Sequence, residues 1–217
     1  QLSVEEKQVE RYEKVINECN EFVDRFPESK MKKEAEDFLK QSQNNISLDN
    51  WRQIVGSVPQ NIHIFNGTVI ENIAFEEASS KTQEVFNFLQ QNGFAPFIES
   101  LPQSFMTMVG EEGINLSGGQ RQMIALARAL YQKPRLLILD EVTSAMDRKS
   151  EQFVLQLLKK LKSEMGIIFI THRLHVLKGF CDRIYIMENG EISMQGNHET
   201  LLQSENLYSQ HWNDLVL

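Results

Sequence analysis

Glycine is missing from the N-terminal quarter of this 217-residue chain. The first glycine of the chain is Gly56. The phosphate-binding pattern Gly-x-x-x-x-Gly-Lys-Ser/Thr occurs nowhere in the chain. Cysteine is also scarce: Cys19 and Cys181 are the only two. Two cysteines exclude a disulfide framework and fit a reducing compartment.

Long apolar runs and excess positive charge are lacking as well. No apolar run approaches the ~20 residues of a membrane-spanning helix, and the chain starts at Gln1 without the charged and apolar leader of a signal peptide. The net charge of −8 argues against a general affinity for nucleic acid or anionic membrane. With 41% hydrophobic and 24% charged residues, the composition is that of an ordinary soluble globular protein.

The most informative stretch is the one that starts at Leu116. Ser117, followed three residues later by Gln120, is a capping box and predicts a helix from 117 to 132. Gly118 and Gly119 leave backbone N–H groups uncovered at the positive end of the helix dipole. These groups predict an anion site, although an ordinary capped helix would show the same spacing.

Two apolar strands follow, and each ends in residues that can do chemistry. The first is Leu136–Leu139, which ends in Asp140 and Glu141, and the second is Ile167–Ile170, which is followed by His172. An amphipathic helix is predicted between them, from Glu151 to Lys162. It gives a strand–helix–strand crossover, which predicts a parallel sheet and therefore an α/β fold.

That order of motifs, with Ser144–Asp147 after the two acids, resembles the nucleotide-binding domain of ATP-binding-cassette (ABC) transporters. The resemblance covers residues 46–217, and Phe65–Ile73 looks like the family's export branch. It implies a partial ABC-type P-loop NTPase sheet, with residues 71–116 as a helical subdomain. Ser104 stands where the family often has glycine.

The resemblance also implies ATP and Mg²⁺ as cofactors and assigns residues to them. Asp140, at the end of a buried strand, can hold Mg²⁺ directly or through water. Glu141 can polarise the attacking water, and His172 can contact the γ-phosphate and that water. Gln60, which follows the strand Ile54–Val58, is implied to reach the metal and the water and to sense a transmembrane partner. The alternative for His172 is a strand-end histidine satisfied by nearby backbone.

In the family the nucleotide lies between the phosphate loop of one domain and the signature loop of the other. Ser117, Gly118, Gly119 and Gln120 would therefore serve an ATP held by a second nucleotide-binding domain in a head-to-tail dimer. Asp147 is implied to cross that dimer interface. The other implied partner is the transmembrane domain of an exporter, which places the chain on the cytoplasmic face of the inner membrane. No nucleic-acid partner is expected.

Several further elements are predicted from periodicity. Residues 82–91 form a helix with Val85, Phe86 and Leu89 inward, and residues 95–100 form another. Asn189-Gly190 turns a hairpin of two strands, and a helical tail begins at His198. The histidines expected to have no functional role are His63, His175, His198 and His211.

Residues 1–45 fall outside the resemblance. Apolar residues at helical spacing over 4–26 and 28–42 predict a helical hairpin. Its pattern looks like a tetratricopeptide unit, and more closely like the repeats of outer-membrane assembly lipoproteins; a generic helical hairpin is the alternative. A single hairpin cannot bury its own apolar face, so it must dock on something. The polar stretch 41–50 is the predicted junction.

Without a phosphate loop, this chain alone is not expected to hold ATP productively, because no nest of N–H donors or lysine meets the β-phosphate. The absence also predicts exposed apolar flanks on the strands of the sheet. Three explanations stand open: a fusion of pieces of two proteins, an N-terminus assigned from the wrong sequence, or a degenerate subunit that only donates a signature loop.

The leading interpretation is the C-terminal catalytic part of an exporter-type ABC domain, in which ATP hydrolysis drives export and a peptide is one candidate cargo. The rival is a non-catalytic scaffold, with the N-terminal hairpin as a binding module. ABC-type DNA-repair ATPases are disfavoured, because they would need long coiled coils.

Overall fold

The computed structural model describes residues 54–111 and 113–216. The chain divides into two compact units, Gln1–Arg52 and Gln53–Leu217, and all described residues belong to the second. The predicted hairpin of residues 1–45 and its junction at 41–50 lie outside the described residues.

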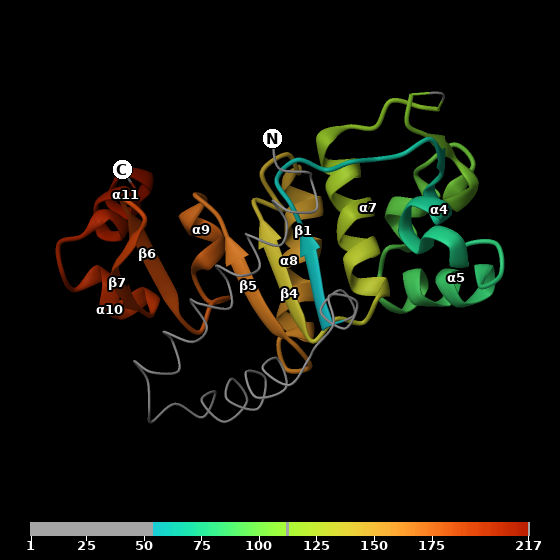
Figure 1. Cartoon of the computed structure of the whole chain (residues 1–217). Coiled ribbons are helices and arrows are strands. Elements are labelled where there is room, and N and C mark those ends of the chain that lie inside the picture. Colours follow the sequence, from blue (N-terminus) through green and yellow to red (C-terminus); the bar gives the residue numbers. More distant parts are fainter. Residues whose placement is uncertain (1–53, 112, 217) are drawn as a thin grey trace, which may run out of the picture. The chain divides into compact units, whose positions relative to one another are not determined.

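A three-stranded parallel sheet forms the centre of the second unit (Figure 1). Its strands are β1 (Val55–Val58), β4 (Leu136–Asp140) and β5 (Gly166–Ile170), in the order β1-β4-β5. Leu139 is paired with Val58 on one side and with Phe169 on the other. The predicted α/β fold with a parallel sheet is therefore confirmed.

Two 14-residue helices bury their apolar sides against this sheet: α7 (Gly118–Tyr131) and α8 (Arg148–Leu161). The capping box places the start of α7 where the sequence predicts it, with Ser117 as its N-cap. The α8 helix begins three residues before the expected Glu151, because the Asp147 side chain accepts from the backbone N–H groups of Lys149 and Ser150. Among the described residues, no helix is both long enough and apolar enough to cross a bilayer.

Short elements connect β1 to α7. In chain order they are β2 (Gly67–Thr68), α4 (Val69–Ala74), the 3-10 turn η1 (Phe75–Glu77), α5 (Thr82–Gln91), α6 (Ala95–Glu99), the 3-10 turn η2 (Ser104–Met106) and β3 (Met108–Val109). The α5 helix has its predicted bounds, and Val85 and Leu89 are buried. The prediction for Phe86 is wrong: its ring is exposed and lies edge-on to Phe105.

A buried polar contact joins α7 to α4. Arg128 on α7 donates from Nε to the backbone oxygen of Asn72 and from Nη2 to its side-chain oxygen, at 2.6 and 3.2 Å. The Asn72 amide in turn donates to the carbonyls of Phe65 and Thr68, and its oxygen accepts from the N–H of Phe65. Burial lowers the pKa of the Arg128 guanidinium, whose charge is held among these acceptors and over the Phe75 ring.

The C-terminal elements form a smaller core. They are α9 (Leu174–Leu177), β6 (Ile184–Glu188), β7 (Glu191–Gly196), α10 (His198–Leu202) and α11 (Leu207–Val216). The strands β6 and β7 pair as the predicted antiparallel hairpin, and Asn189 and Gly190 both have positive φ at its turn. Their core contacts the main one through Phe169 and Cys181; burial raises the pKa of the Cys181 thiol to about 11.

The predicted exposure of apolar strand flanks holds for β5 and only in part for β1 and β4. On β5, Ile168 and Ile170 are 40% and 49% exposed. In β1 and β4, by contrast, Val58, Leu137 and Leu139 are fully buried by the helices that pack on them. Val55, Leu136 and Ile138 of the same strands are half-buried, so the expectation holds only in part for β1 and β4.

Candidate functional site

The carboxyl ends of the three parallel strands bring together side chains from distant parts of the chain. Gln60 follows β1, Asp140 ends β4 with Glu141 directly after it, and His172 follows β5. Gln60 donates from Nε2 to Glu141 Oε2 at 3.1 Å, and His172 Nδ1 lies 3.0 Å from Glu141 Oε1. Gln60, Glu141 and His172 are all predicted to act on the attacking water, and the structure places the first and the last in contact with the carboxylate of Glu141.

The accessibility of this cluster suits a reaction with water. The His172 side chain is 69% exposed, whereas that of Glu141 is 24% exposed. Each carboxylate oxygen of Glu141 already has one partner, so its direction is fixed from both sides. A fixed and partly accessible carboxylate can accept a proton from a bound water, and the neighbouring amide and imidazole can position that water.

Glu141 itself has an uncommon backbone conformation. Its φ is 50°, in the left-handed region that non-glycine residues seldom adopt. Its N–H donates to the carbonyl of Ile170 on β5 at 2.9 Å, which continues the pairing of β4 and β5 by one residue. Strained residues of this kind gather at functional sites, and this one lies where the sequence predicts the catalytic carboxylate.

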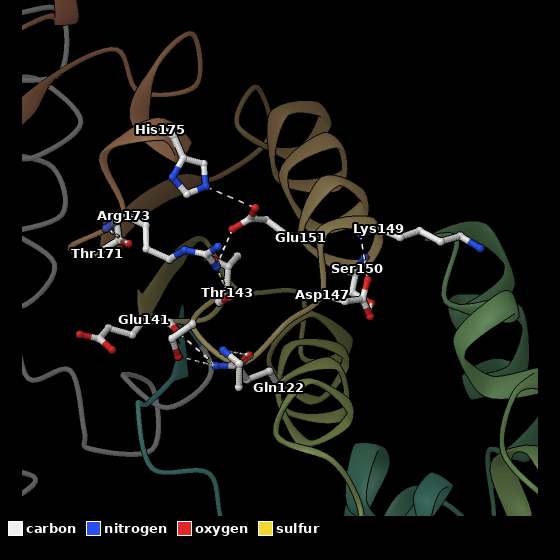
Figure 2. A network of polar contacts seen from close by, with 12 residues as sticks. Gln122, Glu141, Thr143, Asp147, Lys149, Ser150, Glu151, Thr171, Arg173 and His175 are labelled. Atoms are coloured by element: carbon white, nitrogen blue, oxygen red, sulfur yellow. Dashed lines mark hydrogen bonds and ion pairs between the residues drawn. The ribbon is translucent and has the colours of Figure 1, made fainter. Parts of the chain in front are cut away.

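The turn after Glu141 is held by Gln122, a residue that sequence reasoning missed. Gln122 lies on the buried side of α7, and its amide bonds to three groups of this turn (Figure 2). Its position among the apolar residues of the helix could have indicated this role, because a polar side chain on the buried side of a helix must find hydrogen-bond partners.

A second polar network fixes the segment after His172. Arg173 donates from Nη1 to the carbonyl of Thr143 and lies 2.7 Å from Glu151 Oε1, a buried carboxylate on α8. This second contact is an ion pair without the alignment of a hydrogen bond. His175 approaches the other oxygen of Glu151 at 3.4 Å (Figure 2). Sequence reasoning missed Arg173 and Glu151, because neither belongs to a local pattern.

Asp147 has a local role that the sequence interpretation did not include. Its carboxylate caps α8 and also accepts from the Ser150 hydroxyl. These hydrogen bonds, led by the one from the Ser150 backbone, lower the pKa of Asp147. The exposed carboxylate is thus held in one direction at the start of the helix, and its implied place at a dimer interface stays a prediction.

Residues 117–120, which we call the signature stretch, have the predicted capping box. The Ser117 N–H donates to Gln120 Oε1, and the Gln120 N–H donates to Ser117 Oγ. No acidic residue occupies the first turn of α7, so the positive end of its dipole is not neutralised there. A Cβ on Gly118 would come within 2.7 Å of the Ala145 side chain, and one on Gly119 within 3.0 Å of the Ala145 carbonyl oxygen. A side chain at Gly118 would therefore force a shift of the contact with Ala145, and one at Gly119 would make it tight.

These residues fit the implied Mg²⁺ and ATP in part. Asp140, partly buried at the end of β4, and Gln60 beside Glu141 offer the oxygen ligands that Mg²⁺ prefers. The part of the chain that the structure describes holds no cluster of three or more His, Cys, Asp or Glu that would bind a metal alone. Mg²⁺ bound through one or two protein oxygens plus phosphates needs no such cluster. For ATP, the start of α7 fits one phosphate, and no glycine-lysine loop cradles the others.

Comparison with known proteins gives a consistent result. The family model described as "ABC transporter" matches residues 12–144, a range that starts within the N-terminal segment and ends just before Asp147. The ATP-dependent lipid A-core flippase of Haemophilus influenzae is 42% identical over 164 residues, which are 75% of this chain and 28% of that protein. The leukotoxin translocation ATP-binding protein of Mannheimia glucosida is 44% identical over 162 residues, 74% of this chain and 23% of that protein.

A solved structure agrees with these relatives. The ATP-bound structure of a bacterial Atm1-family ABC exporter matches with a TM-score of 0.70 and 36% sequence identity, over 78% of this chain and 30% of that one. The chain thus spans less than a third of the length of the proteins it matches. It belongs to the ABC transporter family, and its described residues have the fold of an exporter-type nucleotide-binding domain.

Proposed function

We propose that this chain supplies the ATP-hydrolysing end of an ABC exporter. The observation that carries the proposal is that Gln60 and His172 both contact the Glu141 carboxylate, with Asp140 directly before Glu141 in the chain. In this assignment Asp140 and Gln60 hold Mg²⁺, Glu141 polarises the attacking water, and His172 contacts the γ-phosphate. Bound Mg²⁺ would neutralise charge on the phosphates during transfer.

The proposed assembly is a head-to-tail dimer with a second nucleotide-binding domain. Ser117, Gly118, Gly119 and Gln120 would face the nucleotide held by that partner, and Asp147 would lie at the shared interface. The dimer would act on the transmembrane domain of an exporter at the cytoplasmic face of the inner membrane. The relatives include a lipid A-core flippase and a leukotoxin translocation protein, so peptide export is one candidate among cargo classes that the transmembrane part would select.

The rival function, a non-catalytic scaffold, would use the N-terminal hairpin. That hairpin lies outside the described residues, and no observation on the described residues favours the scaffold function.

The 217-residue chain alone should hydrolyse ATP at well below 1 s⁻¹, the low end of ordinary enzymes, because its sequence has no glycine-lysine loop for the β-phosphate. The measurement is phosphate release at saturating Mg-ATP for the purified chain and its Glu141→Gln variant. A turnover near 1 s⁻¹ that is lost in the variant would disprove the inactivity while supporting the assignment of Glu141. A chain that neither hydrolyses ATP nor associates with a nucleotide-loaded ABC domain would contradict the proposed function.

A further inference from the structure

Gln122 is a buried amide whose hydrogen bonds all go to one turn. Its side chain lies on α7, and the residue is 4% exposed. Nε2 donates to the carbonyl of Glu141 and to Ser144 Oγ, both at 3.0 Å. Oε1 accepts from the N–H of Ala145 at 3.2 Å. Both amide hydrogens and the amide oxygen are thus used on the segment that directly follows the proposed catalytic carboxylate.

This pattern of donors and acceptors requires glutamine. An apolar side chain of similar length would leave the Ala145 N–H without its acceptor and the Glu141 carbonyl without its donor from α7. A glutamate could accept from Ala145 but could donate to neither oxygen. Buried polar groups left without partners are costly, so the turn would have to move to recover them.

The start of α7 touches the same turn at a second place. Gly118 and Gly119 approach Ala145 closely, so a side chain at either position would displace this contact. One end of the helix therefore packs on Ala145 through bare backbone, and its next turn bonds to the same residue through Gln122. A displacement of the signature stretch is transmitted to the segment 141–145 through both contacts.

Glu141 is the residue at which this displacement would have chemical effects. Its N–H is fixed by Ile170 and its carbonyl by Gln122, while its φ is held at 50°. Both of its peptide groups are anchored, and its carboxylate, which extends from this fixed backbone, contacts Gln60 and His172. We infer that Gln122 is a positioning residue that couples the signature stretch at the start of α7 to the direction of the Glu141 carboxylate. The inference rests on the proposed function, because only that function gives the direction of the Glu141 carboxylate a role in catalysis.

The state of the His172 ring reports the direction of Glu141. A carboxylate oxygen 3.0 Å from Nδ1 can only accept, so in the neutral ring this contact favours the Nδ1–H tautomer over the Nε2–H tautomer. In Gln122→Met the turn relaxes, and the contact is weakened. The ratio of the Nδ1–H to the Nε2–H tautomer should fall at least tenfold, which corresponds to about 1.4 kcal/mol. The measurement is ¹⁵N NMR of the full chain with ring-labelled histidine, with His172→Gln to assign the signals.

Two further variants make the test decisive. Gln156→Met makes the same replacement at an exposed position of α8 and should leave the His172 ratio unchanged. Ser144→Ala removes one acceptor of Gln122 at an exposed residue and should shift the ratio in the same direction by a smaller factor. The inference is overturned if folded Gln122→Met keeps the wild-type ratio, or if Gln156→Met changes it equally. Should Gln122→Met not fold, an unchanged ratio in Ser144→Ala overturns it. No nucleotide is used, so a failure of the proposed ATPase function would be seen separately.

Discussion

The Gly119→Asp variant should associate at least tenfold more weakly than the wild-type chain with an ABC domain that holds Mg-ATP on its own phosphate loop. In the proposed dimer the partner's γ-phosphate faces the start of α7. A helix end contributes about 0.3–2 kcal/mol to binding an anion, and charge-assisted hydrogen bonds from loop donors add about 1.5–3 kcal/mol. A carboxylate at position 119 replaces this attraction by repulsion, and a tenfold loss corresponds to about 1.4 kcal/mol.

Steric and electrostatic effects at position 119 can be separated. Gly119→Ala adds the Cβ that would meet the Ala145 carbonyl at 3.0 Å but adds no charge. Ser117→Ala removes one capping hydroxyl and leaves the backbone donors, so it should weaken association less than Gly119→Asp does. ATP-dependent association is measured by analytical ultracentrifugation, after circular dichroism has shown that each variant is folded. If wild type associates and Gly119→Asp associates equally well, the stretch is only a helix cap.

Replacing Asn72 by alanine should lower the free energy of unfolding by about 3–4 kcal/mol. The side chain is fully buried, and it makes hydrogen bonds to Phe65, Thr68 and Arg128. Truncation leaves these groups without a partner in the protein interior, at about 1–3 kcal/mol for each one that stays unsatisfied. Arg128 adds to the cost, because its guanidinium is charged and largely removed from water. The loss should separate α4 from α7 before the central sheet unfolds.

Urea denaturation followed by circular dichroism measures this effect. Asn87→Ala, at an exposed position of α5, is the matched control and should change stability by no more than about 0.5 kcal/mol. A loss below about 1 kcal/mol in Asn72→Ala would mean that water or a shift of Arg128 satisfies the freed groups, and that this contact does not hold the two helices together.

The elements with strong local signals were predictable from sequence. The capping box of α7 fixed its start, the apolar strands β4 and β5 had the composition of buried parallel strands, and the Asn-Gly turn fixed the β6–β7 hairpin. The short helix α4 was missed, although Thr68 and Glu71 form a capping box there too. The early start of α8 follows from the Asp147 cap, a local role that the family resemblance does not imply.

The candidate site was predictable to the extent that its residues follow strands. Gln60, Glu141 and His172 each come just after or at the end of a parallel strand, and such ends share one edge of a sheet. Gln122 and Arg173 act through tertiary contacts with segments 19 and 30 residues away. A sequence pattern does not tell which polar residue of a helix or loop will turn inward, so their roles required the structure.

The left-handed backbone at Glu141 recurs at Ser104 and Lys133, with φ of 52° and 51°. An L-residue in this region costs roughly 1–2 kcal/mol relative to its usual conformation, and glycine removes much of that cost. Ser104→Gly or Lys133→Gly can therefore return stability to the domain. At Glu141 the same change would delete the carboxylate that meets Gln60 and His172. Glycine at position 104 or 133 can therefore stabilise the domain. At Glu141 the cost of the left-handed backbone is retained, because the proposed chemistry needs the carboxylate of this residue.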